Sequence, residues 1–173
     1  MGLVHALLLT VAQLTCYVPP VDAPVAEPFV APACPYCPGH RGVEYVVAAG
    51  TPVRAAASGE VTFDGVVAGS RYLVVNNDDG LTATYGILAS SAVTVGARVQ
   101  AGQILAHAGA RLYFGLRMGD VYVDPQDYLA VVHWRPRLVP SSGLPGRPAR
   151  PMPPSCPRLS AGGSGPVALL PAW

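Results

Sequence analysis

Short runs in which hydrophobic and polar residues alternate follow one another between residues 42 and 129. Such a period of two places successive side chains on opposite faces of a β-strand, and no stretch of any length has the period of an amphipathic helix. Glycine, asparagine and aspartate separate the runs, with the strongest turn signal at residues 76–80, Asn-Asn-Asp-Asp-Gly. The pattern predicts strands at residues 43–47, 61–63, 73–75, 81–87, 103–107, 112–117 and 121–123.

The predicted fold class is all-β, with a compact antiparallel core of the sandwich or barrel kind. Alternate residues of a strand that is buried on one face point into the core. We therefore expect the core to contain Phe63, Val75, Tyr85, Leu112, Phe114 and Val123.

The sequences on either side of this core have different compositions. Residues 3–14 are apolar but too short to span a bilayer, so residues 1–23 are interpreted as a signal peptide cleaved after Val21-Asp22-Ala23. The usual basic start is missing, which leaves a buried N-terminal helix as the alternative. Residues 24–41 form a proline-rich arm, residues 42–130 the core domain, and residues 131–173 a disordered tail rich in proline, glycine and arginine.

Length and charge limit the possible partners. The chain of 173 residues is long enough for one domain with a hydrophobic core. Its formal net charge is only +1 and its arginines are scattered, so we expect no nucleic-acid partner. No apolar run reaches the length of a membrane span, so we expect no transmembrane span in the mature chain. With the apolar N-terminus, this favours a secreted or cell-envelope protein.

Residues 38–47 carry the first candidate chemistry. His40 and Glu44 are four residues apart, and imidazole and carboxylate are both good zinc ligands. Gly42 between them permits a backbone kink that turns both side chains toward one point. Two ligands hold a metal only weakly, so a zinc site requires a third.

The cysteines allow three interpretations. Cys34 and Cys37 have the spacing of a redox pair, but they lie in a proline-rich segment without the following helix that lowers a thiol pKa. In an exported protein a disulfide is favoured, either between these two or between one of them and Cys156. Together with His40 and Glu44 they also offer ligands for a local structural zinc. A leftover cysteine would be available for an intermolecular bond.

Several segments in series carry a family resemblance. They are residues 40–44 (His-Arg-Gly-Val-Glu), 50–55 (Gly-Thr-Pro-Val-Arg-Ala), 57–61 (Ala-Ser-Gly-Glu-Val), 79–85, 95–105 and 122–129. In this order they resemble the lysostaphin-type (LytM-like) zinc endopeptidases of bacterial cell walls. The resemblance implies a compact core of two antiparallel sheets, the duplicated hybrid motif of lysostaphin-like peptidases.

The resemblance also implies a set of catalytic positions, and this chain departs from it at most of them. His40 matches the first zinc ligand, and Glu44 stands where the family has aspartate. Arg111 and Tyr113 occupy the positions of a His-x-His pair whose second histidine binds zinc, and Ile87 replaces a histidine that assists the water. His107 is the one substitute ligand nearby.

These departures predict a domain without hydrolytic chemistry. Neutral tyrosine is a poor ligand, and a permanently charged arginine repels a divalent cation. We expect no cofactor, and we expect Arg111 and Tyr113 to share one strand face, with Ile87 opposite and Arg111 paired with Glu44. The expected partner is peptidoglycan or a cell-wall hydrolase. The alternatives are an active zinc endopeptidase that cleaves peptidoglycan cross-bridges, and an exported redox or structural-metal module using Cys34 and Cys37.

Overall fold

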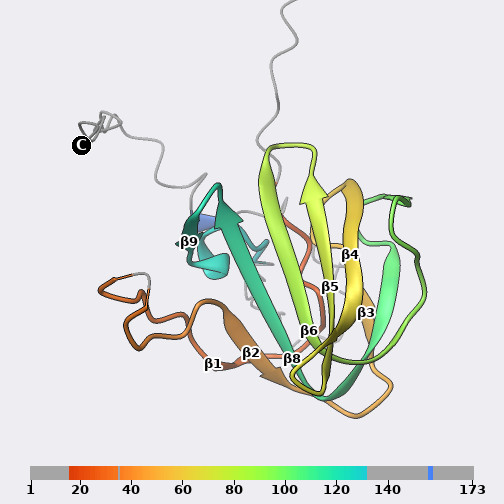
Figure 1. The fold of residues 1–173 in the computed structure, drawn as a ribbon, viewed down its shortest axis with the longest axis horizontal. Helices are drawn as coiled ribbons and strands as arrows, with labels where there is room; N and C mark the ends of the chain where they lie inside the picture. The colour runs from red at the N-terminus through yellow and green to blue at the C-terminus, as the bar shows by residue number, and fades with distance from the viewer. Residues whose placement is uncertain (1–15, 35, 132–155, 158–173) are drawn as a thin grey trace, which may run out of the picture.

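The computed structural model describes residues 16–34, 36–131 and 156–157 (Figure 1). Within them, the chain forms strands β1 (Val25–Glu27), β2 (Val43–Val46), β3 (Pro52–Arg54), β4 (Gly59–Val67), β5 (Ser70–Asn77), β6 (Leu81–Ser91), β7 (Arg98–Val99), β8 (Ile104–Met118) and β9 (Val121–Val123), followed by the short 3-10 helix η1 (Pro125–Asp127). All strand pairings are antiparallel. The all-β prediction is confirmed.

Strand β8 is the centre of one continuous sheet with the order β1-β2-β8-β6-β5-β4-β7, and β3 and β9 also pair with β8. The segments predicted as two strands, 103–107 and 112–117, are thus parts of one 15-residue strand. The pairing of β6 with β8 is irregular between Gly86 and Leu88 and again between Leu88 and Ser90. Such bulges bend strands. The antiparallel core is therefore joined through the long strands β6 and β8 instead of being divided into two separate sheets.

The core is built from the inward faces of these strands. Val75, Tyr85, Leu112 and Phe114 are fully buried, as predicted. The rings of Tyr85 and Phe114 pack with their centroids 5.2 Å apart. The Tyr85 hydroxyl accepts a hydrogen bond of 2.8 Å from the Ala56 backbone N–H, so its polar end is satisfied inside the core.

Two of the residues predicted in the core are not fully buried. Val123 is half-buried at the edge of the core. Phe63 was predicted inside but is 39% exposed. The register of β4 against β5 shifts between Val61 and Phe63. One extra residue reverses the facing of those that follow, so Val61 is buried and Phe63 points outward.

The segment that precedes β1 belongs to the packed domain. Tyr17 and Val21 are buried. The Tyr17 hydroxyl donates to the Asp79 carboxylate at 2.7 Å and accepts from the Asn77 amide at 2.9 Å. The predicted boundary after residue 23 thus falls inside the domain and not at its edge. Residues 1–15, which hold most of the predicted signal peptide, lie outside the described residues, as does most of the predicted tail.

The proline-rich segment is attached to the core at one end and projects from it at the other. Strand β1 pairs with β2. Further on, Val30 and His40 exchange two backbone hydrogen bonds of 2.9 Å each. We call residues 30–34 and 36–40 the arm hairpin; it is the orange loop beside β1 and β2 in Figure 1.

All four cysteines are paired, Cys34 with Cys37 and Cys16 with Cys156. The expectation of a leftover cysteine is therefore wrong, and Cys156 bonds to Cys16 instead of to the arm. Oxidised sulfurs supply no thiolate, so Cys34 and Cys37 in this state offer no ligands to a structural zinc. None of the helices in the described residues is long and apolar enough to cross a membrane.

Candidate functional site: a charged cluster between β1, β2 and β8

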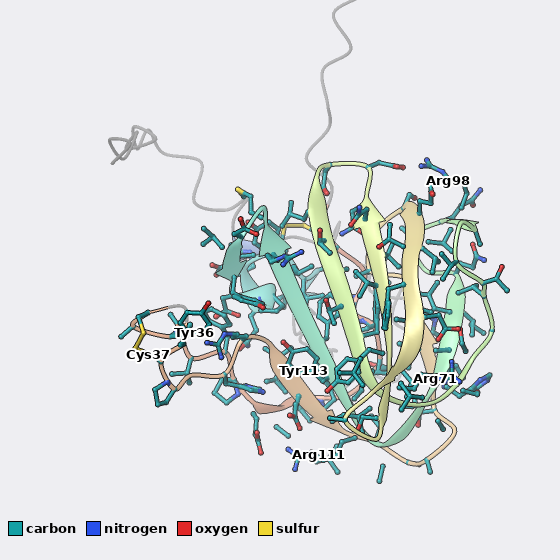
Figure 2. The ribbon with its side chains drawn as sticks, viewed as in Figure 1. Tyr36, Cys37, Arg71, Arg98, Arg111 and Tyr113 are labelled. Carbon is teal, nitrogen blue, oxygen red and sulfur yellow. A yellow bond between two sulfur atoms is a disulfide. The ribbon has the colours of Figure 1, made fainter. Side chains whose placement is uncertain are left out.

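Strands β2 and β8 bring the predicted site residues together. Glu44 of β2 pairs with Tyr113 of β8, and Val46 pairs with Arg111. Arg111 and Tyr113 are two residues apart on one strand, so their side chains leave the sheet on the same face. Both residues are labelled in Figure 2. His40 lies just before β2, with its ring centroid 6.0 Å from that of Tyr113 in an edge-to-face arrangement.

Arg111 is the centre of an ionic cluster. Its Nη2 lies 2.7 Å from Glu44 Oε2, which is the ion pair expected from the catalytic positions that the family resemblance implies. The same nitrogen lies 2.7 Å from Glu27 Oε1, a partner that the sequence did not predict. Charge-assisted hydrogen bonds are shorter and stronger than neutral ones. The two carboxylates raise the pKa of Arg111, chiefly through the hydrogen bond with Glu27.

His40 is held at the edge of this cluster. Its Nδ1 lies 2.8 Å from the Pro28 carbonyl oxygen, so this nitrogen carries the proton and donates it. The opposite ring nitrogen, Nε2, lies 3.5 Å from Glu44 Oε1 and is shielded from solvent. Among the described residues Nε2 has no hydrogen-bonding partner. The ring is therefore oriented by the backbone of the arm and turned toward the Glu44 carboxylate.

Tyr113 fills the space between His40 and the sheet. A Cβ placed on Gly42 would come within 2.7 Å of the Tyr113 ring, and one on Gly115 within 2.7 Å of its hydroxyl, so the ring requires glycine at both positions. The hydroxyl donates to the Arg41 carbonyl oxygen at 2.9 Å. Burial, with smaller contributions from the hydroxyls of Tyr122 and Tyr72, raises the pKa of Tyr113 to about 12. The side chain thus stays a neutral phenol whose proton is committed to the backbone.

The two remaining predicted residues, Ile87 and His107, lie in β6 and in the first part of β8. Ile87 is in β6 at the bulge opposite residues 109–112, with a left-handed φ of 61°. His107 pairs with Pro52 and Ser90 through the backbone, and its Nδ1 lies 3.3 Å from the Ser90 hydroxyl. Among the described residues, the group of possible metal ligands is Glu27, His40 and Glu44, and His107 does not belong to it.

This donor set does not fit the zinc site that the resemblance implies. A catalytic zinc takes three protein ligands and keeps one position open. Tyr113 stands at the third ligand position as a neutral hydrogen-bond donor. Ligand atoms of Glu27, His40 and Glu44 lie within 4.8 Å of one another, but both carboxylates bind the Arg111 guanidinium. No metal-assisted step follows from this arrangement.

The cluster predicts a measurable titration. The Arg111 guanidinium, through its hydrogen bond and its charge, holds the pKa of Glu27 below its ordinary value. A depressed carboxyl pKa stabilises the fold above the pKa of the unfolded chain, and that contribution is lost as pH falls through the folded pKa. We expect Arg111→Gln to raise the pKa of Glu27 toward its ordinary value, measured by NMR of the side-chain carboxyl carbon.

Arg98→Gln is the matched control. Arg98 also forms an exposed ion pair, with Asp78 at 3.0 Å, and lies away from Arg111 in Figure 2. This change should leave the pKa of Glu27 as it is. A Glu27 pKa that is the same in Arg111→Gln and in the unaltered chain would contradict the pairing.

The β core is that of a metallopeptidase-type domain. Residues 38–125 match the sequence profile of peptidase family M23, and the chain belongs to this family. An uncharacterized protein of Mycobacterium tuberculosis is 32% identical over 131 residues, which cover 69% of this chain and 53% of that protein. The chain therefore spans about half the length of this curated relative.

Two solved structures are similar to the fold. Helicobacter pylori Csd3 superposes with a TM-score of 0.60 and 25% identity, covering 66% of this chain and 35% of that one. A zinc-containing peptidase from Vibrio cholerae superposes with a TM-score of 0.56 and 25% identity, covering 64% of this chain and 39% of that one. The Vibrio cholerae structure is that of a zinc-containing peptidase, whereas in this chain Arg111 binds the Glu27 and Glu44 carboxylates. The role of the Arg111 cluster therefore has to be inferred from this chain.

Proposed function

We propose that this chain is an exported M23 domain without peptidase activity, which binds peptidoglycan through the face that carries Arg111 and Tyr113. The proposal rests on the family and on the chemistry of this face. Family M23 supplies the fold and the connection to cell-wall hydrolases. An arginine paired with two carboxylates and a tyrosine bonded to the backbone take the place of a metal and its water at this face.

One observation carries the proposal: a single guanidinium nitrogen lies 2.7 Å from both Glu27 and Glu44. The fixed positive charge takes the place of a cation between two carboxylates, so the face keeps its shape without metal. Arginine and tyrosine are the residues most enriched among energetically dominant binding positions. With Arg111 partly exposed and Tyr113 half-buried beside it, the face is suited to holding a peptide.

Export is supported by the cysteine chemistry. Two disulfides, Cys16–Cys156 and Cys34–Cys37, are typical of proteins that fold in an oxidising compartment. Since Cys16 is part of the packed domain, a leader that is removed would have to be cleaved before it. The cell envelope is accordingly the proposed location.

The test is co-sedimentation with purified insoluble peptidoglycan. We expect the unaltered chain to be recovered in the pellet, and the double variant Arg111→Ala, Tyr113→Ala to bind at least about tenfold more weakly, as loss of dominant contact residues does. Arg98→Ala, which removes an exposed arginine from the Asp78 ion pair, should bind like the unaltered chain. Equal binding by the double variant, or no binding by the unaltered chain, would contradict the proposal. Capture of a wall hydrolase by the unaltered chain without peptidoglycan would make that enzyme the partner.

An active zinc endopeptidase is the second candidate. It is favoured by one observation, that ligand atoms of Glu27, His40 and Glu44 lie within 4.8 Å of one another. It requires Arg111 to leave both carboxylates and Glu27 to serve as the third ligand in place of the missing histidine. The zinc measurements described in the Discussion separate the two candidates.

A further inference from the structure

A cavity of about 340 Å³ lies between the arm hairpin and the strand that closes the core, outside the Arg111 cluster. The arm hairpin lines it with Pro32 and Cys34, and β9 lines it with Val121 and Tyr122. Val121 is exposed, and Tyr122 is 40% exposed. The walls are therefore mainly apolar, and the volume is at the lower end of the range for small-molecule sites.

The cavity is shaped before any ligand arrives. Two backbone hydrogen bonds of 2.9 Å between Val30 and His40 close the base of the arm hairpin. The Cys34–Cys37 disulfide and a hydrogen bond of 3.0 Å from the Cys37 N–H to the Cys34 carbonyl fix its far end. A rigid wall lowers the entropic cost of binding, because little has to be ordered when the ligand enters.

Two groups of opposite charge line this apolar cavity, Arg41 and Asp120. The Arg41 guanidinium lies 5.6 Å from the centroid of the Tyr122 ring and donates to the Cys37 carbonyl at 3.2 Å. A guanidinium has a fork of N–H donors that matches a carboxylate in two parallel bonds. Asp120 supplies carboxylate oxygens that accept from N–H groups. The complementary ligand carries a carboxylate and N–H donors on a small apolar body.

Arg41 contacts both the cavity and the face that carries Tyr113. The backbone carbonyl of Arg41 accepts the hydrogen bond from the Tyr113 hydroxyl, so one residue belongs to the wall of both sites.

We propose that this cavity binds the carboxylate end of a short peptide with small apolar side chains, with Arg41 holding the terminal carboxylate and Asp120 accepting from the peptide N–H groups. This rests on the proposed function, because the short alanine-containing peptides of peptidoglycan supply such ends. It assigns a second contact region, formed by the arm hairpin and β9, to the same wall material.

The experiment titrates the full chain with trialanine and with its C-terminal amide, using isothermal calorimetry. Trialanine should bind the unaltered chain at least about tenfold more tightly than the amide does, since the amide lacks the charge that pairs with Arg41. Arg41→Gln should weaken the binding of trialanine by a similar factor and leave the affinity for the amide nearly unchanged. Such a difference indicates a direct interaction between Arg41 and the carboxylate. Arg98→Gln is the control and should change neither affinity.

Two outcomes would overturn the assignment: no binding of trialanine, or equal affinity for trialanine and its amide. Both are measured on the unaltered chain, so the test stands even if Arg41→Gln disturbs the arm through the lost bond to Cys37. If the chain sediments with peptidoglycan but binds trialanine no more tightly than its amide, the cavity assignment is wrong and the proposed function is still supported. A carboxylate preference that Arg41→Gln removes would support the assignment even where the chain fails to sediment, and then the proposed function is what fails.

Discussion

The double variant Arg111→Ala, Tyr113→His is expected to bind one zinc per chain, and the unaltered chain to contain no stoichiometric zinc. The first change removes the guanidinium that binds both carboxylates. The second supplies an imidazole in place of the Tyr113 ring, whose centroid now lies 6.0 Å from that of His40. His40, Glu44 and this imidazole then make the three-ligand set of a zinc site. We expect the variant to hold zinc on the order of 100-fold more tightly than the unaltered chain, measured by competition with a chromogenic chelator.

The matched control is Arg111→Ala, Tyr113→Phe, which removes the same charge without adding a ligand. This control should bind zinc only weakly. Adding His40→Ala to the variant with Tyr113→His should abolish tight zinc binding. A control that binds zinc as tightly as the histidine variant would show that Arg111 alone excludes the metal, with Glu27 as the third ligand. One zinc in the unaltered chain, lost on His40→Ala, would support the active-enzyme candidate.

Phe114→Ala is expected to lower the free energy of unfolding by about 3–5 kcal/mol, the range for removing a fully buried aromatic ring. Phe114 is completely buried on the inner face of β8, and its ring packs against that of Tyr85 at 5.2 Å. The loss combines reduced hydrophobic burial with a cavity that the surrounding strands fill only in part. Urea unfolding with both disulfides intact measures it.

Phe63→Ala is the control for this prediction. The same substitution at a ring that is 39% exposed should cost no more than about 1 kcal/mol. Equal losses for the two variants would mean that the bulge in β4 is misplaced and that Phe63 belongs to the core.

The family resemblance selected the residues at the centre of the site, and strand alternation predicted how two of them face. A period of two places Arg111 and Tyr113 on one face, and the facing strand brings Glu44 opposite Tyr113. The wrong prediction for Phe63 also came from strand alternation. A single extra residue in β4 changes which face the following side chains take, and no local sequence signal marks this bulge. The alternation of residues therefore predicts which face of the sheet a side chain occupies only as far as the next β-bulge.

Glu27 and the Cys16–Cys156 disulfide depend on contacts between residues far apart in the sequence. Glu27 lies in a segment whose prolines favour an extended linker, and it is 84 residues from Arg111. The two cysteines are separated by 140 residues, and cysteine spacing does not determine which pairs form. Both features depend on how the N-terminal segment packs against the core, which a local pattern does not encode. For the same reason the predicted boundary after residue 23 cuts through buried residues.

The central claim is that Arg111 has replaced the metal and that the domain binds the wall without cutting it. The most direct test is to measure soluble peptide released into the supernatant when the full unaltered chain is incubated with purified peptidoglycan and added zinc. We expect the protein to sediment and no peptide to be released above the level of a buffer control. Release that a chelator stops and that His40→Ala abolishes would contradict it.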